Sequence, residues 1–204
     1  MTDRPRYRRH GEGLEFDRAS FFTDAVYAIA MTLLVVELRV PGGSDADLAA
    51  GLGEEAWAIV GFFFGFILLG RYWMAHHAFW ASLASIDGRL VALNLVYLAF
   101  VAFIPWPVGL VSRHPHAFSA FALFAAAMAT VSLLEVVLYA MAWRGGHFAR
   151  TPDRDEFRRV ALSASAPVAI MLASIPLALA VGPPWAMTFW LVTFPVTARI
   201  DRHG

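Results

Sequence analysis

The sequence predicts an all-α integral membrane protein with six membrane-spanning helices and both termini in the cytoplasm. Three observations lead to this prediction. Hydrophobic residues make up 59% of the 204 residues and charged residues only 16%, which is too apolar for a soluble domain of this length. The chain divides into six apolar segments separated by short polar stretches, and nearly all of its arginines lie on one side of these segments.

The six segments follow from the length of chain that a bilayer requires. A helix needs about 20 mostly apolar residues to cross the hydrocarbon core. Segments of this kind run over 19–40, 55–80, 90–112, 117–143, 159–181 and 184–198, and the sixth is the shortest. The intervening stretches are rich in turn-forming residues: "PGGSDADLAAGLGEE", "ASIDGR", "SRHPH", "RGGHFARTPDRDEFRR" and "GPPW". Prolines inside the third, fifth and sixth segments predict kinked helices.

The polar stretches leave no room for a separate soluble domain. Each holds about twenty residues or fewer, with too little apolar surface to form a core. The basic start of the chain is not followed by a short apolar core and a cleavage site, so no cleaved signal peptide is expected. We predict one six-helix domain over 1–204, with a short cytoplasmic segment at 1–17.

The orientation follows from the arginines, because basic residues are retained in the cytoplasm. With the N-terminus inside, the cytoplasmic side holds fourteen of the sixteen basic residues, and the other side keeps Arg39 and Arg113. The acidic loop after the first segment falls outside. The fourteen are Arg4, Arg6, Arg8, Arg9, Arg18, Arg71, Arg89, Arg144, Arg150, Arg154, Arg158, Arg159, Arg199 and Arg202.

Composition also excludes several classes of function. The chain contains no cysteine, so disulfides, thiolate catalysis and cysteine metal sites are ruled out. Its formal net charge is zero, which gives no reason to expect nucleic acid as a partner.

The first segment carries charges at membrane depth. Arg18 and Asp24 are six positions apart, about 240° around a helix, so they cannot pair along one face. An unsatisfied polar group costs several kcal/mol inside a membrane, so partners are expected on other helices. The second and third segments supply candidates near the same depth: Arg71, Trp73, His76, His77 and Asn94. Arg18 fits equally well as a side chain that only extends to the cytoplasmic interface.

Three motifs resemble one known family. Arg18, Phe22, Thr23 and Asp24 are similar to the R-x-x-x-F-[ST]-D signature of the transmembrane protein 175 family. The stretches "YWMAHHAF" (72–79) and "LNLVYLAFVAFIPWP" (93–107) are similar to the family as well. The sequence departs from the usual pattern by Thr23 in place of Ser, which keeps the hydroxyl, and by Ala25 in place of Gly, which is frequent in bacterial members.

The resemblance implies a potassium-permeable channel of a bacterial cell membrane. Animal members of the family are endolysosomal potassium channels, and bacterial members have one six-helix unit per chain. The resemblance implies a homotetramer in the lipid bilayer, with a pore for monovalent cations lined by the first helix of each subunit. It also implies a structural polar network that comprises Arg18, Phe22, Thr23, Asp24, Trp73, His77 and Asn94.

The same resemblance implies that ions pass rings of apolar side chains and no filter of backbone carbonyls. A filter sequence such as TVGYG is missing here. Motif spacing transfers the narrowest ring to Ile29, with Thr32 and Leu33 as the next layers outward and Val36 one turn further. The spacing i, i+3, i+4, i+7 places the four on one stripe of a helix. Because this helix is apolar all round, periodicity alone would not select this stripe and favours ordinary lipid-facing or core packing for these residues.

The adjacent histidines and one acidic residue allow other readings. His76 and His77 point about 100° apart on a helix, and no cysteine accompanies them, so hydrogen bonding with Asp24 is favoured over a metal or haem site. Glu135, in the fourth segment, fits either a proton relay or an interhelical hydrogen bond.

Two other classes of membrane protein are less well supported. A secondary transporter is the main alternative, but the first three segments do not resemble the last three as an internal repeat would. An enzyme would need a nucleophile, an acid–base pair or a metal cluster near one surface, and only the two histidines suggest one. The sequence therefore predicts a channel with no catalytic residues, metal or cofactor.

Overall fold

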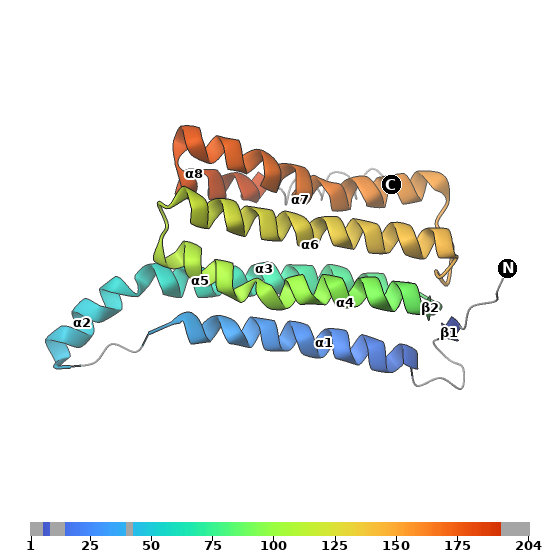
Figure 1. The fold of residues 1–204 in the computed structure, drawn as a ribbon, viewed down its shortest axis with the longest axis horizontal. Helices are drawn as coiled ribbons and strands as arrows, with labels where there is room; N and C mark the ends of the chain where they lie inside the picture. The colour runs from blue at the N-terminus through green and yellow to red at the C-terminus, as the bar shows by residue number, and fades with distance from the viewer. Residues whose placement is uncertain (1–5, 9–14, 40–42, 193–204) are drawn as a thin grey trace.

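The computed structural model describes residues 6–8, 15–39 and 43–192 and is mostly helical (Figure 1). Two short 3₁₀-helices, labelled η, accompany the α-helices. In chain order the elements are β1 Arg6–Arg8, α1 Glu15–Leu33, η1 Leu34–Glu37, α2 Asp45–Glu54, α3 Ala56–Ala81, β2 Ser85–Asp87, α4 Gly88–Phe103, α5 Pro105–Arg113, α6 Phe118–Gly145, α7 Arg154–Val181, α8 Pro183–Thr188 and η2 Phe189–Val192.

Five helical stretches are long and apolar enough to cross a membrane. They are Glu15–Glu37, Ala56–Ala81, Gly88–Arg113, Phe118–Gly145 and Arg154–Val181. These stretches agree with the first five predicted segments. The predicted sixth segment, 184–198, coincides with α8 and η2 as far as Val192, and its remainder at 193–198 lies outside the described residues.

Two predicted helices differ in detail from the structure. The first segment is not one continuous α-helix, because the last four residues, Leu34–Glu37, tighten into η1. The third segment is broken between α4 and α5, at Ile104 and Pro105. Proline has no backbone N–H to donate into the preceding turn, so α4 ends there and α5 begins with proline at its first position.

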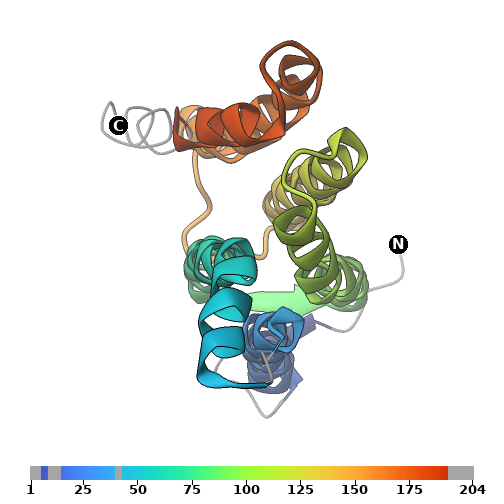
Figure 2. The ribbon, with the colours of Figure 1, turned by 90° about the vertical axis from the view of Figure 1, so that its left-hand side faces the viewer.

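The helices pack in successive layers. Viewed along the bundle, α1 lies at one edge and α7 with α8 at the opposite edge (Figure 2). Between them, α3 and α4 contact α1, α4 contacts α6, and α6 packs extensively against α7. The core contains large apolar and aromatic side chains from these layers: Tyr27, Leu69, Leu90, Tyr97, Phe121, Phe124, Met128 and Leu138 are fully buried.

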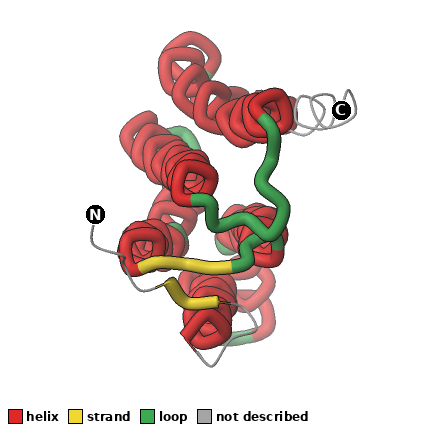
Figure 3. Tube along the Cα trace, turned by 90° about the vertical axis from the view of Figure 1, so that its right-hand side faces the viewer, coloured by secondary structure: helices red, strands yellow, loops and turns green. Residues whose placement is uncertain are grey.

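A small antiparallel ribbon makes the fold differ from the all-α prediction. β1 pairs with β2 in the register Arg6 to Asp87 and Arg8 to Ser85. The ribbon lies beside the ends of α1, α3 and α4 (Figure 3). We call this end of the bundle the ribbon end. Hydropathy did not predict these strands, because three-residue segments are too short to show alternation.

At the opposite end, α2 projects from the bundle, and we call this the α2 end (Figure 1). Ser44 caps α2: its hydroxyl accepts the backbone N–H of Asp47, and the Asp47 carboxylate accepts the Ser44 backbone N–H at 2.9 Å. The hydrogen bonds from the Ser44 hydroxyl and backbone lower the pKa of the exposed Asp47 carboxyl. The start of α2 is therefore fixed by contacts between Ser44 and Asp47.

Candidate functional site

The first helix has one buried face and one exposed face. Its buried face is formed by Phe16, Thr23, Tyr27 and Ala30, which pack toward α3 and α4. Its other side exposes large apolar side chains, among them Phe21, Phe22, Ile29 and Leu33. Contiguous exposed apolar surface marks contact with lipid or with another protein surface. The face that the rest of the subunit leaves uncovered is thus available to one of these.

All four predicted pore residues lie on this exposed face. Ile29 is 58% exposed, Leu33 44% and Val36 73%, and Thr32 is exposed beside them. Val36 lies in η1, not in α1 as the single-helix prediction assumed. Since side chains three apart in a 3₁₀-helix lie directly above one another, Val36 remains in line with Leu33. The stripe therefore continues across the change of helix type.

The Thr32 hydroxyl is the polar group of the stripe. It donates to the backbone carbonyl of Ile29 at 2.9 Å, one turn earlier on the same helix. This bond occupies its hydrogen and leaves oxygen lone pairs on the exposed face. A ring of such residues would present acceptors, not donors, between two apolar layers.

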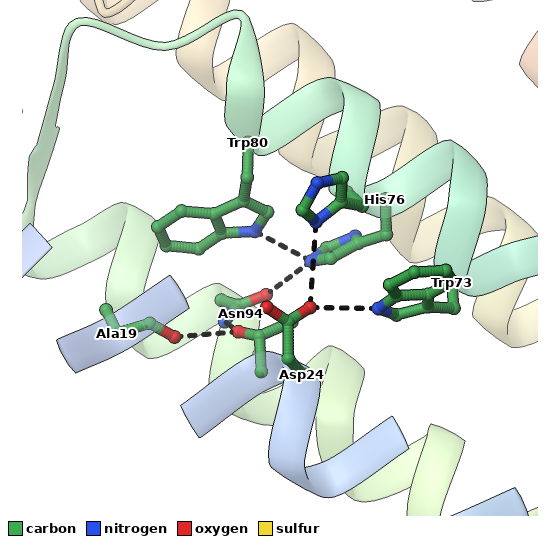
Figure 4. Close-up of polar contacts among 8 residues, drawn as sticks. Ala19, Asp24, Trp73, His76, Trp80 and Asn94 are labelled. Carbon is green, nitrogen blue, oxygen red and sulfur yellow. Dashed lines mark hydrogen bonds and ion pairs between the residues drawn. The ribbon is translucent and has the colours of Figure 1, made fainter. Parts of the chain in front are cut away.

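The structure brings Asp24, Trp73 and His77 together at the boundary of α1 and α3. Figure 4 shows the contact between Asp24 and Trp73. The indole N–H of Trp73 donates to Oδ1 of Asp24 at 2.9 Å. Nδ1 of His77 lies 3.7 Å from the same oxygen, and its ring lies 5.4 Å from the Trp73 ring. Asp24 and His77 are both half exposed. Within the described residues, the Asp24 carboxylate has Trp73 as a direct donor and the His77 imidazole nearby.

A second group of hydrogen bonds is buried beside the contacts of Asp24, on the face of α1 that packs against α3 and α4 (Figure 4). The Thr23 hydroxyl donates to the carbonyl of Ala19, and the Asn94 amide donates to the Thr23 oxygen at 2.9 Å. Nε2 of His76 lies 3.1 Å from Oδ1 of Asn94 and accepts the indole N–H of Trp80 at 2.7 Å. The hydrogen bond from Asn94 to Thr23 joins α4 to α1, and His76 of α3 lies against Asn94.

The two histidines therefore have different environments. His76 is 1% exposed and belongs to the buried group, whereas His77 is at the surface next to Asp24. Because an indole N–H can only donate, Nε2 of His76 is the acceptor and its proton lies on Nδ1. In the described part of the chain, no three His, Asp or Glu side chains gather as metal ligands would. The separation of the rings also fits a hydrogen-bonding role better than shared metal ligation.

Two residues predicted for the network are not brought into it. Phe22 is half exposed on the uncovered face of α1, and Arg18 is exposed near the start of the helix. Arg18 makes no hydrogen bond or ion pair with another described residue. Within one subunit, the expected interhelical partner of Arg18 is therefore not found among these residues, which leaves the interfacial alternative.

Sequence reasoning missed a buried pair of tyrosines. The hydroxyls of Tyr27 on α1 and Tyr97 on α4 are hydrogen bonded, and both side chains are fully buried. The Tyr97 ring also stacks on His76 with 4.5 Å between ring centroids. A signal was present, because Tyr27 follows Thr23 by four residues and Tyr97 follows Asn94 by three. Both pairs therefore lie on the same helix faces as the predicted network.

Glu135 lies away from α1, beside a cavity of about 580 Å³ between α3, α6 and α7. Arg71 lines the same cavity, together with mostly apolar side chains such as Phe79, Met171 and Trp190. Glu135 forms no hydrogen bond or ion pair within the described ranges. Of the two readings left open for Glu135, a proton relay and an interhelical hydrogen bond, the second is therefore not seen there.

Substitutions of His77 should distinguish a hydrogen-bonding histidine from a metal ligand. We expect His77→Gln to unfold near the parent temperature in detergent, because an amide can still donate toward Asp24. His77→Ala should lose no more than about 1 kcal/mol of stability, because the contact is half exposed and Asp24 keeps Trp73. A chelator should leave the unfolding temperatures of the parent and of both variants unchanged. A fall in the parent's unfolding temperature on chelation would contradict the hydrogen-bonding role of His77.

Part of the sequence matches the model of a known protein family. Residues 18–105 match the family model described as "Endosomal/lysosomal potassium channel TMEM175". The match begins at Arg18 and ends at Pro105, so it contains the exposed stripe of α1 and both hydrogen-bond groups described above.

Individual relatives extend the likeness beyond these residues. A potassium channel of Streptomyces collinus is 28% identical over 91% of this chain and 96% of its own length. The endosomal/lysosomal proton channel TMEM175 of Bos taurus is 33% identical over 46% of this chain, which spans only 22% of that longer protein. A crystal structure of a lysosomal potassium-selective channel TMEM175 homolog from Chamaesiphon minutus superposes with a TM-score of 0.78 at 22% identity, covering 93% of this chain and 100% of that chain. This last likeness shows a shared fold.

Proposed function

We propose that the chain is a potassium channel of the transmembrane protein 175 family and that its pore is lined by α1 from four identical subunits. The observation that carries this proposal is the exposed apolar stripe of α1 opposite a buried polar face. Potassium as the permeant ion is supported by the Streptomyces collinus relative, a potassium channel similar over nearly its whole length. The family and its relatives are ion channels, so the chain is not an enzyme and needs no cofactor.

The stripe suits a pore that is controlled by apolar rings. Four copies of α1 around one axis would place Ile29 of each subunit in the narrowest ring and Thr32, Leu33 and Val36 in the layers beyond. An apolar ring stops ions by dewetting when it is narrow and passes them when it widens. Such a ring has no carbonyl oxygens to replace the water around potassium, so we expect weaker discrimination among monovalent cations than a carbonyl filter gives.

The polar face of α1 supports the same arrangement from the other side. Hydrogen bonds to α3 and α4 through Asp24, Thr23 and Asn94 fix the rotation of α1 about its own axis. Since Ile29 and these polar residues are on one helix, a fixed rotation directs the stripe away from the subunit core. The network therefore orients the residues that would face the ion.

The proposed topology places the ribbon end in the cytoplasm and the α2 end outside. The distribution of arginines supports this orientation, with Arg39 and Arg113 at the α2 end. A sixth span over 184–198 would bring the C-terminus back to the cytoplasm, as an even number of spans requires. The protein would then be a multi-pass protein of the bacterial cell membrane.

Ion flux in liposomes tests the channel proposal. We expect the purified protein to carry potassium down an applied voltage without saturation and without exchange against internal potassium. The measurement is a flux assay at several potassium concentrations, with empty liposomes as the control. Saturable counterflow with no voltage-driven current would instead indicate a secondary transporter.

A further inference from the structure

An arginine on α5 contacts the end of η1. Arg113, the last residue of α5, donates from its guanidinium to the backbone carbonyl of Glu37. Its Nε also lies 3.9 Å from the Glu37 carboxylate. Glu37 is the last residue of η1, one position after Val36. The contact therefore acts on the backbone directly beyond the proposed outermost ring.

Glu55 completes a grip on both sides of Leu38. Its Oε1 lies 3.7 Å from Nη1 of Arg113, and its Oε2 accepts the backbone N–H of Arg39 at 3.1 Å. One ion pair thus binds the carbonyl before Leu38 and the amide after it. Because Glu55 directly precedes α3 and Arg113 ends α5, the exit of the chain from η1 is tied to two other helices.

Two glycines allow close contacts beside this grip. A Cβ atom at Gly109 would lie 2.3 Å from Oε2 of Glu37, so a larger residue there would require the Glu37 side chain to move. A Cβ atom at Gly61 would lie 1.8 Å from the Ser112 hydroxyl, so α3 and α5 approach each other closely there. Glu55 and Arg113 therefore lie at the ends of two helices, α3 and α5, that pack tightly against each other.

We propose that the Arg113–Glu55 ion pair is a clamp that positions Val36 and so sets the width of the outermost apolar ring. Neither residue touches the ion; both act through the backbone at positions 37 and 39. The inference rests on the proposed function, because it requires α1 and η1 to line the pore.

The clamp should affect local geometry far more than folding. Partly exposed ion pairs contribute little to the stability of a whole domain. This pair, however, holds the two backbone groups on either side of Leu38, directly after η1. Ile29 lies eight positions before Glu37, inside an α-helix with its own hydrogen bonds. Release of the clamp should therefore alter Val36 and spare Ile29.

Cysteine reporters can test this directly, because the chain has no native cysteine. Val36→Cys reports on the outermost ring, and Ile29→Cys is the matched control deeper on the same stripe. For each reporter we would measure the rate of modification by neutral and by positively charged methanethiosulfonate reagents, and the yield of intersubunit disulfide under mild oxidation. The neutral reagent separates changes in access from changes in local charge.

We expect Arg113→Gln to change the modification rate and disulfide yield at Val36→Cys severalfold and to leave Ile29→Cys unchanged. Arg113→Lys should have an intermediate effect, because lysine keeps the charge but not the forked geometry. Glu55→Gln should also be intermediate, because its amide oxygen can still accept the Arg39 N–H. Arg39→Gln should match the parent, since the clamp uses only the backbone of Arg39.

The outcomes separate the clamp from the pore. Unchanged rates at Val36→Cys in Arg113→Gln and in Glu55→Gln, while modification still blocks current, would overturn the clamp. If modification of Val36→Cys and Ile29→Cys never alters current in the parent background, then α1 does not line the pore and the proposed function itself fails. An equal change at both reporters would also overturn the clamp, because it would indicate a movement of the whole helix.

Discussion

Replacement of Ile29 by asparagine is expected to raise the resting ion current and to flatten the preference among monovalent cations. Ile29 is 58% exposed on the stripe of α1 and has no apolar cover within its own subunit. In the pore proposed above, an amide at this position would keep the ring of Ile29 side chains hydrated, so that ring could no longer close by dewetting. The size of the effect should exceed that of any other single substitution considered for this chain, because it removes the barrier and not merely its support.

Recordings in planar bilayers would measure this effect as the closed-state current and the reversal potential between potassium and sodium. Val35→Asn is the matched control, because Val35 is also an exposed apolar residue, in η1, but it lies off the stripe. Both proteins gain the same amide, so a general effect of polarity would appear in both. Current and reversal potentials equal to the parent in Ile29→Asn would remove Ile29 from the pore.

Replacement of Asn94 by leucine is expected to destabilise the subunit by about 1 to 3 kcal/mol. Asn94 is buried, donates to Thr23 and lies next to His76. Leucine has the same branching and the same number of side-chain heavy atoms and is somewhat larger, so none of the loss would come from a cavity. The loss would come from the hydrogen bond to Thr23 on α1, whose buried oxygen loses its donor.

A double-mutant cycle with Thr23→Val would isolate the contact. In the Asn94→Leu background, Thr23→Val should cost less than in the parent, because its partner has already been removed. Equilibrium unfolding in mild detergent supplies the four free energies. Equal costs of Thr23→Val in the two backgrounds would show that the hydrogen bond between these side chains contributes nothing to stability.

The long helices could be predicted because a bilayer constrains them strongly. The predicted segment 55–80 corresponds to α3 at Ala56–Ala81, and 117–143 corresponds to α6 at Phe118–Gly145. In each case, length and apolarity settle the helix, and polar turn residues settle its ends. Interior contacts are not needed for either decision.

The change from α1 to η1 could not be predicted in the same way. No glycine or proline interrupts Leu34–Glu37, and the residues that hold its end, Glu55 and Arg113, are distant in sequence. The ribbon of β1 and β2 has the same origin, since it joins Arg6 to Asp87. Structure that depends on contacts between distant segments leaves little mark on local composition.

The sequence predicted which residues gather at the candidate site better than it predicted which hydrogen bonds they make. The motifs place Asp24, Trp73 and His77 at similar depth, and the structure brings them together. The separation of His76 from His77 depends on the rotation of α3, which an apolar helix does not reveal through periodicity. The environment of Arg18 could not be predicted either, because a charged side chain near a helix end can face water as readily as a partner on another helix.

The break at Ile104 and Pro105 has a mechanical consequence for α1. The two halves of one span hold its opposite ends: α4 contributes Asn94 and Tyr97 near the ribbon end, and α5 contributes Arg113 at the α2 end. An unbroken helix would transmit a tilt at one end to the other as a rigid lever. Pro105 removes one hydrogen bond across the joint, so α5 is coupled to α4 less rigidly than it would be within one continuous helix. If α1 lines the pore as proposed, changes on the two sides of the membrane would reach it through two separate supports.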